Sequence, residues 1–159
     1  MLKHELSSLE LEHHLKPFIT KEFRLIFDSD LANLETQEDL FHDEYFAILV
    51  IQNSDKSNHF TVLINHDEGE IEFFDSLAHN NKLLLDYKKK NPWLKKLVVN
   101  KKQLQDKDAI SCGIWCISRV QALNTDLKNY QKLWKKSTAD NEKRLYYTYS
   151  IFDLIGRNQ

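Results

Sequence analysis

A chain of 159 residues with 42% hydrophobic and 29% charged side chains has the composition of one packed domain, which excludes global disorder. Its 22 basic and 24 acidic residues leave a formal net charge of −2, so charge offers no general basis for binding nucleic acid or an anionic membrane. No apolar run approaches the roughly 20 residues of a membrane span, and the N-terminus lacks the apolar region of a signal peptide.

The first 44 residues carry helical patterns. Leu6, Leu9 and Leu15 recur at near-helical spacing until Pro17 interrupts them. A second helix is expected in one of two segments, PFITKEFRLIF (17–27) or TQEDLFHDEYF (36–46). We therefore treat residues 1–44 as an N-terminal helical flank.

The middle of the chain changes to strand patterns. Short apolar runs predict strands at YFAILVIQN (45–53), HFTVLINH (59–66) and GEIEFFDSL (69–77), the last with Ile71 and Phe73 alternating with Glu70 and Glu72. The polar HDEG turn joins the second and third strands into a hairpin.

After the hairpin, the pattern alternates between helix and strand. We expect a helix ended near Pro92, a fourth strand in KKLVVNKKQ (95–103) and a central helix in CGIWCISRVQALN (112–124), which is apolar on most sides. Two closing helices follow, with Asp126 and Asp140 as expected N-caps. The chain is therefore predicted to be one α+β domain over residues 1–159. A small mixed, largely antiparallel sheet packs on the central helix in a core at 45–123, and 124–159 form a C-terminal helical flank.

The two cysteines, Cys112 and Cys116, lie four residues apart in the predicted central helix. They cannot easily bridge there, which favours a reducing, cytosolic compartment. No compact Cys/His cluster completes a four-ligand zinc site around them, so no metal is expected. Cys116, one turn into a buried helix, is predicted to be a packing residue.

A candidate triad arises from the hairpin and the central helix. His59 and Asp75 lie symmetrically about Asp67, which places both side chains on one face, opposite or diagonal, with β-carbons roughly 4.5–8 Å apart. The carboxylate would orient the imidazole and stabilise its protonated form. Cys112 stands at a predicted helix start, where free N–H groups and the helix dipole favour a thiolate.

The segment around the cysteine also offers oxyanion donors. Backbone N–H groups at the helix start suit a developing oxyanion, and Gly113 lets other backbone approach closely. A side-chain amide upstream, Gln105 or alternatively Gln103, supplies a second donor. An isolated Cys-Gly pair is more often an inert core thiol, and it is the placement of His59 and Asp75 that favours a nucleophile at Cys112.

The motifs NHFTVLI, IEFFDSL and LQDKDAISCGIWC resemble the Ulp/sentrin-specific proteases of clan CE. These are papain-like cysteine proteases that cleave ubiquitin-like modifiers, with adenoviral protease and bacterial effector deubiquitinases as relatives. The resemblance covers about residues 45–123 and implies a catalytic triad of His59, Asp75 and Cys112. Gln105 corresponds to the oxyanion glutamine with about one residue of misregister, because Asp106 stands at the usual offset.

Two further positions depart from the family pattern. Phe60 replaces the usual tryptophan after the histidine, where the resemblance implies a wall of the channel for a modifier's Gly-Gly tail. Ser111 replaces the aspartate before the cysteine. The short connection from Asp75 to Cys112 resembles the compact bacterial effectors, many of which act on ubiquitin chains.

The resemblance implies a cofactor-free, monomeric deubiquitinase or related isopeptidase. Its partner is ubiquitin or a ubiquitin-like protein such as SUMO or NEDD8, with no role for nucleic acid or membrane. The expected location is a reducing cytosol, with delivery into a host cytoplasm as an effector. Two alternatives remain open at this point: a Yop-type acetyltransferase using acetyl-coenzyme A, and a pseudo-protease that binds a modifier without cutting it.

Overall fold

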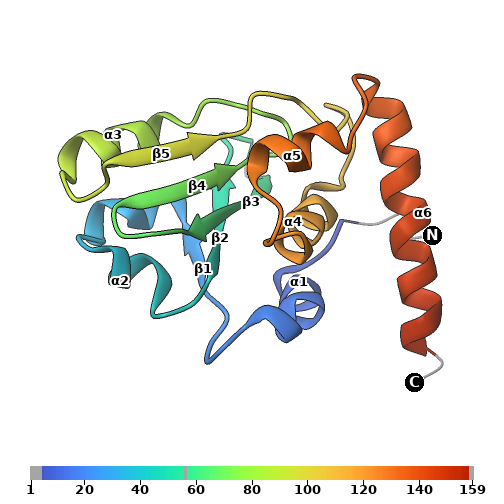
Figure 1. Cartoon of the computed structure of the whole chain (residues 1–159), viewed down its shortest axis with the longest axis horizontal. Coiled ribbons are helices and arrows are strands. Elements are labelled where there is room, and N and C mark those ends of the chain that lie inside the picture. The colour runs from blue at the N-terminus through green and yellow to red at the C-terminus, as the bar shows by residue number, and fades with distance from the viewer. Residues whose placement is uncertain (1–4, 56, 158–159) are drawn as a thin grey trace.

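A five-stranded sheet forms the middle of the protein in the computed structural model, which describes residues 5–55 and 57–157 (Figure 1). Its order is β1-β2-β3-β4-β5. The strands are β1 (Leu25–Phe27), β2 (Phe46–Gln52), β3 (Asn58–Asn65), β4 (Glu70–Phe74) and β5 (Lys96–Val99). The three central strands are antiparallel, and the two edge strands run parallel to their neighbours. The predicted small, mixed and largely antiparallel sheet is confirmed.

Helices cover both faces of the sheet. The structure has α1 (Ser8–Leu15), α2 (Gln37–Phe41), α3 (Lys82–Lys90), α4 (Cys112–Gln121), α5 (Leu127–Lys132) and α6 (Thr138–Arg157), with 3₁₀ turns at Lys16–Phe18 and Asp28–Asn33. One face packs on α4, with α1, α5 and α6 around that helix, and the other packs on α2 and α3 (Figure 1). The predicted central helix is therefore confirmed. The predicted domain limits at residues 1 and 159 lie outside the described residues.

Alternation along the strands divides the core into two layers. Ile48 and Val50 of β2 and Val62 of β3 face α4, whereas Leu49 of β2 and Leu63 of β3 face α2 and α3. Because successive side chains in a strand point to opposite faces, a sheet covered on both sides needs continuous apolar runs. This explains why β2 and β3 were recognisable from sequence.

The N-terminal flank differs in part from its prediction. The leucine pattern does form α1, but residues 17–27 contain β1 and no α-helix, and the second helix is the five-residue α2 within 36–46. Strand β1 has only three residues, too few to show a period in the sequence. Its backbone pairs with β2 in parallel, which adds an edge to the sheet beside the candidate site.

The two expected helix caps have different outcomes. Asp126 caps α5, because its side chain accepts from the backbone N–H of Asn129 at 2.8 Å. Asp140 is not an N-cap, because α6 begins at Thr138 and the backbone N–H of Asp140 donates to the hydroxyl of Ser137 at 3.3 Å. Ser137 therefore takes the capping role expected for Asp140, and α6 begins three residues earlier than an N-cap at Asp140 would place it.

Candidate active site

His59 and Asp75 are in direct contact. His59 is the second residue of β3, Asp75 follows the last residue of β4, and the His59 Nε2 to Asp75 Oδ1 distance is 2.6 Å. Strand pairing sets Val62 opposite Phe74, so the hairpin is centred one residue beyond the predicted Asp67. The predicted centre is therefore wrong by one residue, and Asp75 is the diagonal neighbour of His59, which is one of the two expected arrangements. The two side chains still share a face because a two-residue shift preserves strand alternation.

The carboxylate and backbone of Asp75 are held by neighbouring groups. Its Oδ1 also accepts from the backbone N–H of Leu77 at 2.9 Å. Asn100, which follows β5, accepts from the Asp75 N–H at 2.9 Å and donates to the Asp75 carbonyl at 2.6 Å. These bonds restrict the carboxylate to one orientation toward His59. Asn100 is not predictable from its local sequence, in which its only signal is a polar residue directly after a strand.

Cys112 occupies the first position of α4, and this helix packs against β3. Burial by itself lowers the pKa of His59. Hydrogen bonds to Asp75 and Cys112 and the charges of both residues outweigh burial, raising the pKa of His59 to about 9. Both Asp75 and Cys112 therefore favour the protonated form of His59. Because Asp75 binds Nε2, Nδ1 is the ring nitrogen left for the Cys112 sulfur.

The raised pKa of His59 predicts a pH dependence. Its charged form stabilises the fold fully below the ordinary pKa of 6.5, and this contribution is lost as the pH rises to about 9. Catalysis that needs protonated His59 should likewise decline near pH 9. Asp75→Asn removes a bond and a charge that raise the pKa, so its decline should begin at lower pH. Hydrolysis rates measured from pH 6 to 10 test this, and an unshifted limb in Asp75→Asn would contradict it.

Gln105 points into the protein beside the hairpin. Its side-chain oxygen accepts from the hydroxyl of Ser76 at 2.5 Å, and its amide nitrogen donates to the carbonyl of Ala109 at 2.9 Å. Its backbone N–H also donates to the Ser76 carbonyl at 3.0 Å. Gln105 is thus held in place by Ser76, the residue that follows Asp75. Its side-chain amide still has one proton that can be donated to a further acceptor.

The neighbours of Gln105 are occupied elsewhere. The Asp106 carboxylate accepts from the backbone N–H of Asp108 at 3.3 Å within the following turn. The Gln103 amide donates to the Gln105 carbonyl at 3.0 Å from an exposed position. Of the two glutamines considered from sequence, Gln105 is therefore the buried one next to the hairpin.

A mutation at Gln105 tests its role. Gln105→Ala should lower kcat about 100-fold with little change in KM, because a donor to the transition state is lost. Gln103→Ala is the matched control and should keep kcat, since its amide only bonds the chain nearby. Steady-state hydrolysis by both variants gives the answer. Equal rates for the two would remove Gln105 from the oxyanion site.

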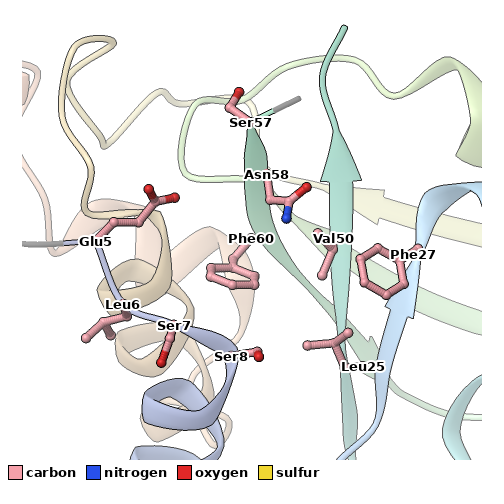
Figure 2. Close-up of a pocket in the computed structure, with 10 residues that line it drawn as sticks. All are labelled: Glu5, Leu6, Ser7, Ser8, Leu25, Phe27, Val50, Ser57, Asn58 and Phe60. Atoms are coloured by element: carbon pink, nitrogen blue, oxygen red, sulfur yellow. The ribbon is translucent and has the colours of Figure 1, made fainter. Parts of the chain in front are cut away.

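Phe60 lines a groove of about 470 Å³ between β3 and the N-terminal segment. Figure 2 shows Phe60 facing Leu6, with Val50 and Phe27 on the neighbouring strands. A β-carbon at Gly113 would lie 3.2 Å from the Leu6 β-carbon and 3.6 Å from the Phe60 ring, so the groove adjoins the first turn of α4. The wall formed by Leu6 was not predicted, because no local sequence pattern marks it.

Cys116 lies one turn beyond Cys112 and is buried in the core, in keeping with the packing role predicted for it. Burial raises the pKa of its thiol well above the ordinary value, and the nearby Cys112 and Asp75 charges add to this. Within the described residues, no group of three or more His, Cys, Asp or Glu side chains is arranged to hold a metal ion. In the same part of the chain, no helix has the length and apolarity to cross a membrane.

Comparison with known proteins places the fold. No protein-family model and no curated protein matches the sequence. The structure is similar to ChlaDub1 from Chlamydia trachomatis, with a TM-score of 0.51 and 13% identity over 89% of this chain and 72% of that one. The central domain of Lpg1148 from Legionella pneumophila gives 0.48 and 12%, over 93% and 97% of the two chains. The yeast Ulp1 protease domain in complex with Smt3 gives 0.36 and 12%, over 80% and 89%.

The similarity to ChlaDub1 carries the comparison, since the other two superpose less closely. At this identity it establishes the fold alone. The chain therefore has the α+β, Ulp-type arrangement expected from its sequence.

Proposed function

We propose that this chain is a cysteine isopeptidase that removes ubiquitin or a ubiquitin-like modifier from lysine side chains. The observation that carries the proposal is the hydrogen bond of His59 with Asp75 at 2.6 Å, in a histidine whose pKa is raised by Asp75 and by Cys112. A nucleophile, a base and a residue that orients the base are the parts required for thiol acyl transfer. The shared fold with ChlaDub1, a Chlamydia deubiquitinase, supports the choice of substrate class.

The first half of the reaction forms a thioester. The Cys112 thiolate attacks the carbonyl carbon of the modifier's C-terminal glycine, and the resulting oxyanion is held by the Cys112 backbone N–H and the Gln105 amide. The C–N bond then breaks while His59 gives its proton to the leaving lysine amine. Asp75 keeps the imidazole oriented and stabilises its charged form throughout.

The second half releases the modifier. Neutral His59 takes a proton from water, which attacks the thioester carbonyl and restores the Cys112 thiolate with protonated His59. We expect the modifier's tail to lie in the groove beside Phe60 and Leu6, which adjoins the first turn of α4. The expectation of a Gly-Gly terminus comes from the resemblance, in which the residue at the position of Phe60 lines the channel for that tail.

Hydrolysis of fluorogenic C-terminal conjugates of ubiquitin, NEDD8 and SUMO tests the proposal. We expect the wild-type protein to release the fluorophore from ubiquitin fastest, since the compact connection between Asp75 and Cys112 resembles the bacterial deubiquitinases. Labelled acetyl-coenzyme A, offered with a protein acceptor, serves as the second arm. Acetyl transfer without hydrolysis of any conjugate would overturn the proposal in favour of an acetyltransferase.

A further inference from the structure

A buried carboxylate from α6 lies against the segment that precedes Cys112. Glu142 Oε1 accepts from the backbone N–H of Asp106 at 3.1 Å, the hydroxyl of Ser111 at 2.9 Å and the indole N–H of Trp115 at 3.2 Å. Its second oxygen, Oε2, is buried and has no hydrogen-bond partner among the described residues. One carboxylate oxygen of α6 therefore accepts hydrogen bonds from three residues between positions 106 and 115.

The three donors bracket the candidate catalytic groups. Asp106 directly follows Gln105, and Ser111 directly precedes Cys112, so Glu142 holds both ends of the intervening loop. Trp115 adds the first turn of α4 to the same carboxylate. Because hydrogen bonds to an ionised acceptor are stronger than neutral ones, this arrangement restricts the separation between Gln105 and Cys112.

Tyr146 lies one turn beyond Glu142 along α6, on the same face of the helix. Burial raises the pKa of Tyr146, the charges of Glu142 and Cys112 raise it further, and a hydrogen bond with Ser111 opposes them. Residues four apart on a helix share a face, so Glu142 and Tyr146 approach Ser111 together. Helix α6 therefore contacts the residue before the nucleophile through Glu142, with Tyr146 on the same face of the helix.

A carboxylate is a costly choice if α6 only needs an anchor. Burying a carboxylate oxygen without a partner is unfavourable, and an apolar residue would pack α6 against Trp115 without that cost. The same helix does have an anchor of a different kind at Tyr149, whose hydroxyl donates to Gln121 at 2.8 Å near the far end of α4. The contacts of Glu142 are instead directed at the loop between Gln105 and Cys112.

We propose that Glu142 is a positioning residue of the active site, which holds the Gln105 amide and the Cys112 N–H at the separation that an oxyanion requires. The inference rests on the proposed function, since it assigns Glu142 to the same oxyanion site. It makes α6, which the resemblance to clan CE proteases does not cover, necessary for catalysis.

The test compares Glu142→Ala, Glu142→Gln and Tyr149→Phe. We expect kcat for conjugate hydrolysis to fall about 100-fold in Glu142→Ala with KM little changed, the scale expected for a displaced oxyanion donor. Glu142→Gln should recover most of the rate, because its amide oxygen can accept the same bonds. Tyr149→Phe, which loses a bond between α6 and α4 away from Cys112, should lower Tm without lowering kcat.

Alkylation of Cys112 by iodoacetamide, followed by peptide mapping, separates this inference from the proposed function. If the wild-type protein hydrolyses no conjugate, the proposed function fails. The positioning role still predicts that Cys112 alkylates roughly tenfold more slowly in Glu142→Ala, because the thiol is displaced from His59. Both variants are compared at a temperature at which both are folded. If Cys112 is alkylated at the same rate in Glu142→Ala as in Tyr149→Phe, the inference is overturned. Should Glu142→Ala not fold, Ser111→Ala replaces it: a partial loss of kcat supports the inference, and unchanged kcat and alkylation overturn it.

Discussion

Cys112→Ala is expected to abolish modifier cleavage while the fold is retained. Removing the nucleophile of a catalytic triad lowers turnover by about 10⁴-fold to 10⁶-fold, which reaches the background of most assays. The fold should tolerate the change because Cys112 is a small side chain at the first turn of α4, with no disulfide. Turnover of the ubiquitin conjugate, together with a circular-dichroism melt, measures both effects.

Cys116→Ala is the matched control for this prediction. Cys116 lies on the same helix one turn later, and its raised pKa keeps the thiol protonated and unreactive. We expect its activity to stay within a few-fold of wild type, with a stability loss of about 1 kcal/mol from the small cavity. Cleavage that survives Cys112→Ala but is lost in Cys116→Ala would exchange the roles of the two cysteines and contradict the mechanism.

Glu72→Ala is expected to destabilise the protein by about 3–5 kcal/mol, because it leaves the Arg119 guanidinium buried without its counter-charge. Arg119 binds the two carboxylate oxygens of Glu72 at 2.8 and 2.9 Å, and both side chains are at most 1% exposed. The pair joins β4 to α4, so it also bears on the position of the helix that begins at Cys112. Urea unfolding followed by circular dichroism gives the free-energy difference.

Two controls show whether burial is the cause. Glu70, two residues earlier on the same strand, pairs with the exposed Lys96 at 3.4 Å, so Glu70→Ala should cost about 0–1 kcal/mol. The double variant Glu72→Leu with Arg119→Met should recover much of the stability lost by Glu72→Ala, since it removes both charges. Equal costs at Glu70 and Glu72 would show that the buried pair is not a main contributor.

The features that sequence predicted best are those with a local period. Strands β2 and β3 are continuous apolar runs, α4 is apolar on most sides, and the contact of His59 with Asp75 follows from strand alternation. That contact survived a register error because a shift of two residues leaves each side chain on its face. Local patterns were therefore sufficient to place His59 beside Asp75 and to identify the helix that begins at Cys112.

The features that sequence missed depend on partners far along the chain. Glu72 alternates with Ile71 and Phe73 as an exposed residue would, yet it is buried. Its burial is possible because it pairs with Arg119, which lies 47 residues later in the chain. Glu142 reaches Ser111 from 31 residues away. No periodicity encodes such pairings, because the tertiary fold alone brings the two segments together.

The most direct test of the account is a ubiquitin probe with a thiol-reactive group in place of its C-terminal carboxylate. We expect one covalent adduct by intact mass, mapped to Cys112, and a large loss of labelling in His59→Ala. SUMO and NEDD8 probes of the same chemistry would report the modifier preferred. An adduct at Cys116, or no adduct with any of the three probes, would contradict the assignment of Cys112 and His59 as the groups that attack a modifier's C-terminus.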